Sequence, residues 1–288
     1  MRKPVSHWVS AWTFSWAATL NQSYEEVTMQ ARKYATILVT LVCSINPAVA
    51  QPNFDSVDIE TAQVRGPIYF LHAGPRIGNI AASVGSDGIL LVDDQFATLA
   101  EKIESAFSAI ASGTLKFIIN THWHGDHTGG NQIFGFETPI IAHTNVRKRL
   151  MTQQIIGNRA VSAAPRQAWP VITFDNSVSV HFNGEEIQII HFAHGHTDGD
   201  SVIFFTGSNV VHTGDLFFVG RFPFIDLDSG GSIHGFINNV ADIIARVDEN
   251  VAIIPGHGPL ASLDDLRTAH RMLEETTESV SRSISEGN

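Results

Sequence analysis

The chain has 288 residues, of which 43% are hydrophobic and 16% charged, so it can bury a large core within one domain. Acidic residues outnumber basic residues by 29 to 18, and the formal net charge is −11. Such a balance repels phosphate groups, so we expect a small-molecule substrate and no nucleic-acid partner.

The first fifty residues have the pattern of an export segment. Residues 29–33 form a basic start, residues 34–45 are apolar, and residues 48–50 form a small-x-small cleavage site. We therefore predict a signal peptide over 29–50 and a mature domain over 51–288. A periplasmic location follows if the host is a bacterium. Because the apolar run is too short for a stable transmembrane helix, we expect no stable membrane insertion after cleavage.

Residues 1–28 lie upstream of this predicted signal peptide. Met29 would make an ordinary translation start, so we interpret residues 1–28 as an over-long start or a disordered extension. The alternative is an interfacial amphipathic helix, because Trp8, Trp12 and Trp16 recur at i, i+4 and i+8. The only cysteine of the chain lies in the signal peptide, so we expect neither a disulfide nor thiol chemistry in the mature domain.

Short apolar runs broken by glycine turns predict strands in the first part of the mature domain. These runs cover residues 68–71, 80–84 and 89–92, and Asp93 closes the third. A carboxylate at a strand end beside metal ligands can orient a ligand histidine, and a helix N-cap or turn role is the alternative. Residues 99–110 have apolar side chains at helical spacing, which predicts an amphipathic helix.

Three histidines and one aspartate follow the next apolar run, residues 117–119, within a few positions. Imidazole nitrogens and carboxylate oxygens are ligands that zinc prefers, and four of them exceed what one tetrahedral ion with an open position can use. We therefore expect two ions. Hydrogen-bonded polar groups on a surface loop are the alternative, which fits a single histidine better than this density. The four candidates are His122, His124, Asp126 and His127.

The rest of the chain alternates predicted strands and helices. The strands cover residues 139–142, three runs within 171–192, and residues 202–205, 210–212 and 251–254. The helices cover residues 144–153, 233–247 and 263–284. Three more metal-type side chains follow strands of this part, namely His196, Asp215 and His257. Because each follows an apolar strand, one edge of a sheet can gather all seven side chains into one pocket.

In order and residue type, these groups resemble the metallo-β-lactamase superfamily over about residues 66–270. The resemblance implies an α/β fold, the four-layer αββα sandwich, and a site with two zinc ions per chain. It implies a first zinc held by His122, His124 and His196, and a second held by Asp126, His127 and His257. Asp215 would bridge the two ions. The remaining histidines near the motifs, His191, His194 and His212, receive no role.

A pair of zinc ions about 3.5–4 Å apart can hold a shared water as hydroxide and polarise a carbonyl toward it, so we expect hydrolysis. Asp126 would be the catalytic residue that orients this nucleophile and handles its proton. Asp93 would act behind the ligands by orienting one of the histidines.

Two departures from the family pattern divide the expected substrates. The β-lactamases with a cysteine at the second site have that cysteine where this chain has Asp215, and a substrate-binding lysine where it has Phe218. The bridging aspartate resembles glyoxalase II and the lactonases. Glyoxalase II, however, continues into a helical glutathione-binding domain, and only about thirty residues follow His257 here.

The predicted export favours a β-lactamase-like enzyme, weak or generalist, that acts on β-lactam antibiotics. A lactonase, esterase or thioesterase of the same superfamily is the alternative. A secreted zinc-binding protein without catalysis belongs to a different class of function. It would need a coordinatively closed site, and the predicted ligand set leaves room for water.

The segment after the bridging acid contains four phenylalanines and one arginine, which predicts a pocket wall. In this interpretation Phe218 and Phe222 pack against a substrate ring, and Arg221 binds a carboxylate. In the alternative, the phenylalanines are buried in the core and Arg221 pairs with Asp226 or Asp228.

Overall fold

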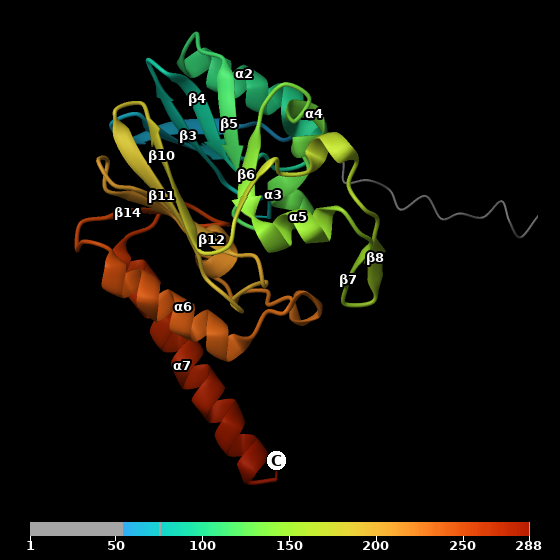
Figure 1. Cartoon of the computed structure of the whole chain (residues 1–288). Coiled ribbons are helices and arrows are strands. Elements are labelled where there is room, and N and C mark those ends of the chain that lie inside the picture. The colour runs from blue at the N-terminus through green and yellow to red at the C-terminus, as the bar shows by residue number, and fades with distance from the viewer. Residues whose placement is uncertain (1–53, 75, 288) are drawn as a thin grey trace, which may run out of the picture. The chain divides into compact units, whose positions relative to one another are not determined.

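The computed structural model describes residues 54–74 and 76–287. The predicted signal peptide and residues 1–28 lie outside the described residues. Two β-sheets lie face to face, and helices cover the outer face of each sheet (Figure 1). The described part of the chain therefore has the predicted four-layer αββα arrangement.

The first sheet has seven strands in the order β1-β2-β3-β4-β5-β6-β9. Strands β1 to β4 form an antiparallel meander, and β5, β6 and β9 add to it in parallel. The strands are β1 (Glu60–Arg65), β2 (Ile68–His72), β3 (Ile80–Gly85), β4 (Gly88–Val92), β5 (Leu115–Ile119), β6 (Ile140–His143) and β9 (Ile172–Phe174).

Helix α2 (Ala100–Ile110) covers the outer face of this sheet, after a 3-10 turn η1 (Ala97–Leu99). Its apolar stripe, with Ile103 and Phe107, packs against Leu91 and Ile118 of the sheet. Burying that stripe is what fixes the helix on the sheet, because the opposite side of the helix is charged and exposed.

The second sheet has five strands in the order β10-β11-β12-β13-β14. They are β10 (Ser177–Phe182), β11 (Glu185–His191), β12 (Ser201–Phe205), β13 (Val210–His212) and β14 (Ala252–Ile254), and only β13 and β14 pair in parallel. Asn183 and Gly184 form the turn between β10 and β11, both with positive φ, as a two-residue hairpin turn with the strand twist requires. Helices α6 (Ile233–Arg246) and α7 (Leu263–Ser285) cover the outer face.

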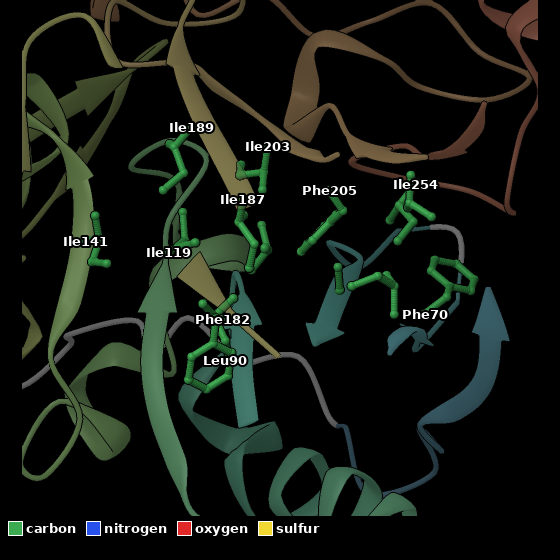
Figure 2. Packing of buried hydrophobic residues seen from close by; sticks show 14 of the residues in the cluster. Phe70, Leu90, Ile119, Ile141, Phe182, Ile187, Ile189, Ile203, Phe205 and Ile254 are labelled. Carbon is green, nitrogen blue, oxygen red and sulfur yellow. The ribbon is translucent and has the colours of Figure 1, made fainter. Parts of the chain in front are cut away.

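The main core lies between the two sheets. Leu90 and Ile119 from the first sheet meet Ile187, Ile203 and Phe205 from the second, as Figure 2 shows. All five side chains are at most 1% exposed, so the two sheets share one dry interface. Burial of each such side chain contributes roughly 1.5–3 kcal/mol, which is enough to hold the strand ends of the two sheets in a fixed relation.

The structure corrects one predicted boundary and adds elements that the sequence did not predict. The helix predicted over 144–153 is α5 (Thr144–Leu150), because the chain then turns into a small hairpin of β7 (Gln154–Ile156) and β8 (Arg159–Val161). Strand β1 was also not predicted, since it is a polar, exposed edge strand without an apolar run. None of the described helices is both long enough and apolar enough to span a membrane.

Candidate metal centre

The first group of predicted ligands occupies the loop and short helix that follow β5. His122 stands three residues after the strand, and His124 directly precedes α3 (Gly125–Thr128). Asp126 and His127 lie within that one-turn helix. The last two residues of β5, Ile118 and Ile119, are fully buried, so this loop starts from a rigid strand end.

The other three predicted ligands come from the second sheet. His196 lies in the loop between β11 and β12, Asp215 lies in the 3-10 turn η3 (Gly214–Leu216) after β13, and His257 follows β14. Because β13 and β14 run parallel, their ends deliver Asp215 and His257 to the same edge of the sandwich.

The structure brings all seven predicted side chains together in two groups. The first consists of His122, His124, His196 and Asp215, and the second of Asp126, His127 and His257. Within each group, one potential ligand atom per residue lies within 4.8 Å of the others. The membership of the groups is the one that the sequence analysis predicted for two ions, with Asp215 counted in the first.

Asp215 faces both groups at once. Its Oδ2 atom lies 3.4 Å from Nε2 of His196 and 3.8 Å from Nε2 of His122. Its Oδ1 atom lies 3.1 Å from Nε2 of His127 and 3.4 Å from Nε2 of His257. A carboxylate placed in this way offers one oxygen to each group, which is the arrangement a bridging ligand needs.

The ring nitrogens of the ligand histidines point at one another, an arrangement that suits a cation between them. Nδ1 of His124 lies 2.8 Å from Nε2 of His196, and Nε2 of His127 lies 3.4 Å from Nε2 of His257. The Nε2 atom of His122 is buried without a hydrogen-bond partner. Buried polar atoms normally have partners, so nitrogens that converge in this way indicate a place for metal ions with imidazole and carboxylate ligands.

Asp93 holds two of the histidines from behind. Its Oδ2 atom lies 2.8 Å from Nδ1 of His127 and accepts a hydrogen bond from the hydroxyl of Thr121, while its Oδ1 atom accepts one from the backbone N–H of Thr121. The same hydroxyl lies 3.0 Å from Nδ1 of His122. Asp93 also has a positive φ of 62°, so it is a turn residue as well as a partner of the ligands. Nε2 of each histidine is thereby directed toward the centre.

The structure adds a residue that the sequence analysis did not place in the centre. Oδ2 of Asp226 lies 2.9 Å from Nε2 of His124, and the carboxylate is buried. This contact leaves Nδ1 of His124 to face the metal group. In the same way, Nδ1 of His196 donates a hydrogen bond of 2.7 Å to the carbonyl of Phe224, which leaves Nε2 to face the metal group. Thus the loop after Asp215 returns to orient two ligands.

The protonation states suit metal binding at the first group. Burial opposes a charge on Asp215, but His127 and His257 outweigh it and hold the pKa of Asp215 well below its usual value. Burial lowers the pKa of His122, and it lowers the pKa of His196 to about 4. Ionised carboxylates and neutral imidazoles are the forms that coordinate metals.

The family is established by direct comparison. Residues 79–257 match the model of the metallo-β-lactamase superfamily, which is more than half of the chain and contains every predicted ligand. The chain belongs to the metallo-β-lactamase superfamily. The predicted family and fold class are both confirmed.

The following relatives are distant in sequence. "Probable metallo-hydrolase YqgX" from Bacillus subtilis (strain 168) is 24% identical over 148 residues, which cover 49% of this chain and 68% of the relative. The fold is similar to that of the DIM-1 metallo-β-lactamase, with a TM-score of 0.61, 18% identity, and coverage of 76% of this chain and 98% of the other. The fold is also similar to that of a metallo-β-lactamase from Pontibacter korlensis, with a TM-score of 0.62, 14% identity, and coverage of 75% of this chain and 99% of the other.

In this superfamily member, a cleft of about 420 Å³ opens directly over the metal groups. Asp126, Asp215, His124 and His257 line its floor. Its walls are mostly apolar and aromatic, with two arginines, and consist of Phe96, Ile156, Phe218, Phe222, Phe224, Arg76 and Arg221. The sequence analysis named Phe218, Arg221 and Phe222. The same predicted wall contained Phe224. The analysis missed Arg76, Phe96 and Ile156, because they come from the β2–β3 loop, the loop after β4 and strand β7.

Part of the segment after Asp215 is exposed at the cleft, and part of it is buried. Phe222 and Phe224 are exposed at the cleft, whereas Phe218 is only 6% exposed and stacks on His257 with ring centroids 5.2 Å apart. Arg221 lies over the ring of Phe218 at 5.0 Å, and no ion pair joins it to Asp226 or Asp228 among the described residues. The arginine is therefore available to the cleft.

The three histidines without a predicted role lie outside both groups. His191 and His194 each donate a hydrogen bond from Nδ1 to a backbone carbonyl, and His212 is buried between the backbone of Asn79 and that of Gly214. His191 stacks on His143 with ring centroids 3.7 Å apart, well bonded and away from the cleft lining. These side chains support the fold around the site.

Proposed function

We propose that this chain is a zinc-dependent hydrolase that opens cyclic amides, with β-lactam antibiotics as the best candidate substrates. The observation that carries the proposal is the position of Asp215, whose two oxygens each face one group of ligands at the floor of an open cleft. Zinc ions bound by these groups would supply Lewis acidity toward a carbonyl and activation of water near neutral pH.

Asp126 is the best candidate for the residue that accepts the proton of the attacking water. Its carboxylate lines the cleft and remains partly exposed, and it lies 3.2 Å from Nε2 of His257. Burial raises its pKa, but His127 and His257 outweigh this effect, so the pKa of Asp126 is lowered. An ionised carboxylate at this place can orient the attacking water and hold its proton at an Oδ atom until the leaving nitrogen accepts it.

The cleft walls support a substrate with an apolar body and a negative group. Phe222 and Phe224 offer exposed aromatic surface, and Arg76 and Arg221 are the two cations of the lining. In a protein with a net charge of −11, two arginines at one cleft favour an anionic ligand, and a guanidinium binds a carboxylate with two hydrogen bonds. Bicyclic β-lactams that carry a carboxylate have both features.

A lactonase, esterase or thioesterase activity is the second candidate. Two residues favour it. Asp215 stands where the β-lactamases with a cysteine at the second metal site have that cysteine, and Phe218 stands where they have a substrate-binding lysine. Phe218 stacks on His257 and is buried, so it offers no charge to a substrate carboxylate. The names of the solved relatives favour lactams, and the Bacillus relative is named only as a probable metallo-hydrolase.

A substrate panel tests the proposal. A carboxylated bicyclic β-lactam, a neutral lactone and a thioester are offered to the isolated chain before chelation, after chelation and after zinc is restored. We expect lactam turnover that chelation removes and zinc restores. Fast lactone or thioester hydrolysis without lactam turnover would favour the second candidate. No turnover of any substrate by the zinc-loaded chain would favour a zinc-binding protein without catalysis.

We also propose that the chain is exported to the periplasm, where β-lactams act. This proposal rests on the basic, apolar and small-x-small order of residues 29–50.

A further inference from the structure

Helix α7 continues well past the part of the domain that it covers. It starts with a capping box between Ser262 and Asp265, and its buried residues, Leu263, Leu266 and Leu273, all lie in its first half. Figure 1 shows the C-terminal half running beyond α6. Twelve residues, or about 18 Å of helix, follow Leu273 without another buried side chain.

The apolar seam of α7 does not stop where the domain stops. Leu266, Leu273 and Val280 are seven residues apart. A second row with the same period lies between them and begins and ends with apolar residues, with two polar members in the middle: Leu263, His270, Thr277 and Ile284. Alternating steps of three and four are the pattern of a helix that packs along one side of another helix. Val280 and Ile284 continue this seam, yet they are 53% and 69% exposed.

An apolar groove of about 330 Å³ runs beside this exposed seam. Leu273, Thr277 and Val280 form one wall, and the loop with Phe222 and Ile225 forms the other. Apart from His234, no ionisable side chain lines the groove. The charged residues of this stretch are absent from the lining and exposed, namely Glu274, Glu275, Glu278 and Arg282.

We propose that a second copy of this chain occupies the groove, with the two α7 helices antiparallel about a two-fold axis between residues 278 and 279. In this register Leu273 of each copy lies opposite Ile284 of the other, and Thr277 lies opposite Val280. Every contact then occurs twice, as in an isologous dimer. The exposed Ile284 of one helix enters the groove beside Leu273 of the other.

The side chains beside the seam favour a copy of the chain over a membrane surface. Thr276, Ser281 and Ser283 flank the seam and carry no charge. Glu274 also flanks it, but in this register it lies opposite Ser283 of the other copy, so a symmetric pair places no like charges opposite one another there. Amphipathic helices that bind anionic membranes have lysine and arginine beside the apolar face, whereas this stretch contains Glu274, Glu275 and Glu278.

The contact area is modest, because each copy contributes half a helix and one groove. Interfaces at the low end of the specific range bury roughly 1,200 Å² in total. We therefore expect a dissociation constant in the micromolar range, so the dimer should form and dissociate as the protein concentration changes.

Sedimentation velocity of the full chain between ~1 and ~200 µM tests the proposal. The mass should double over this range. In the double variant Val280→Glu, Ile284→Glu the dissociation constant should rise at least about a hundredfold, because two seam positions on each copy become charged. Zinc content should stay unchanged, which shows that the variant is folded. The matched control Glu275→Ala, Glu278→Ala changes the opposite side of the helix and should still dimerise.

Cross-linking tests the register. In a Cys43→Ser background, a mixture of the single variants Thr277→Cys and Val280→Cys should give covalent dimers that join one variant to the other on mild oxidation. A mixture of the single variants Glu275→Cys and Glu278→Cys should not. A wild-type chain that stays monomeric at ~200 µM would overturn the proposal. So would a dimer that survives both seam substitutions, or seam-dependent binding to phosphatidylglycerol vesicles by a monomer.

Discussion

Asp226 and His124 are joined by a buried contact of 2.9 Å between Oδ2 and Nε2, although 102 positions separate them in the chain. The contact ties the loop that forms the cleft wall to the loop that begins the metal centre. A carboxylate behind a ligand histidine fixes which nitrogen is free and increases its basicity. Asp226 is thus a positioning residue for both the wall and the centre.

We predict that Asp226→Ala lowers zinc affinity about 10–100-fold, because His124 loses the group that fixes its orientation. Competition with a coloured chelator measures the change. Asp226 also caps the 3-10 turn η4 (Leu227–Ser229), so circular dichroism must show that the variant is folded. Asp228→Ala, at an exposed position of the same turn, is the control and should keep the affinity of the wild type. Equal affinities for all three chains would contradict the orienting role.

The second prediction concerns stoichiometry. The purified chain should hold about two zinc ions, because seven side chains in two groups exceed the needs of one tetrahedral ion. Elemental analysis after dialysis measures this number. His196→Ala should lose zinc and most activity, whereas His194→Ala should lose neither, since His194 is exposed and bonded to a backbone carbonyl. One zinc with full activity, or equal losses in both variants, would show the ligand assignment to be wrong.

The third prediction concerns the two arginines of the cleft. Arg221→Ala should raise KM for a carboxylated lactam about tenfold, and KM for a neutral lactone by much less, because a charge-assisted hydrogen bond is lost only with the first substrate. Arg76→Ala tests the second arginine of the cleft separately. If it changes KM for both substrates equally, Arg76 contributes to cleft shape rather than to charge recognition. Steady-state kinetics with both substrates measure these effects.

The fourth prediction concerns acid stability. Burial lowers the pKa of His143 to about 4, with a further contribution from His191 stacked on it. The unfolded chain, with an ordinary pKa of about 6.5, therefore binds the proton first, and the free energy of unfolding falls as the pH drops from about 6.5 to about 4. His143→Gln should reduce this fall by roughly 2 kcal/mol.

Urea unfolding at a series of pH values measures this effect. His191, Asp175, Asp198 and His194 also act on this histidine pair, so the comparison is made between variants at each pH rather than from one curve. His181→Gln, at an exposed position of β10, is the matched control for replacing a histidine by glutamine outside the stacked pair. A His143→Gln profile parallel to that of the wild type would refute the assignment.

The fifth prediction concerns processing. If residues 29–50 are a signal peptide, the exported protein should begin at Gln51. Mass spectrometry of the periplasmic fraction measures the N-terminus. A full-length chain in the cytoplasm would instead favour a role for Trp8, Trp12 and Trp16.

The sequence predicted the strand ends well because apolar, β-branched runs are short and end in the ligands themselves. It did not predict Asp226, whose carboxylate reaches His124 across the sandwich and follows no strand. Nor did it predict the β7–β8 hairpin. Its only local marker is the turn with Gly157, where φ is +58°, and the hairpin's strands have three residues each. Long-range contacts and short strands leave little periodic pattern to detect.

The candidate ligands are divided between the two sheets: His122, His124, Asp126 and His127 follow β5 of the first, and His196, Asp215 and His257 belong to the second. Cations held between them would act as a clasp at one edge of the sandwich. Ligand binding to the folded state alone adds RT ln(1 + [L]/Kd) to the free energy of unfolding. For the proposed zinc hydrolase, a shortage of zinc would therefore reduce the amount of folded protein as well as its turnover. The cellular abundance of a variant, and not its activity alone, would then report how strongly each of these side chains contributes to metal binding.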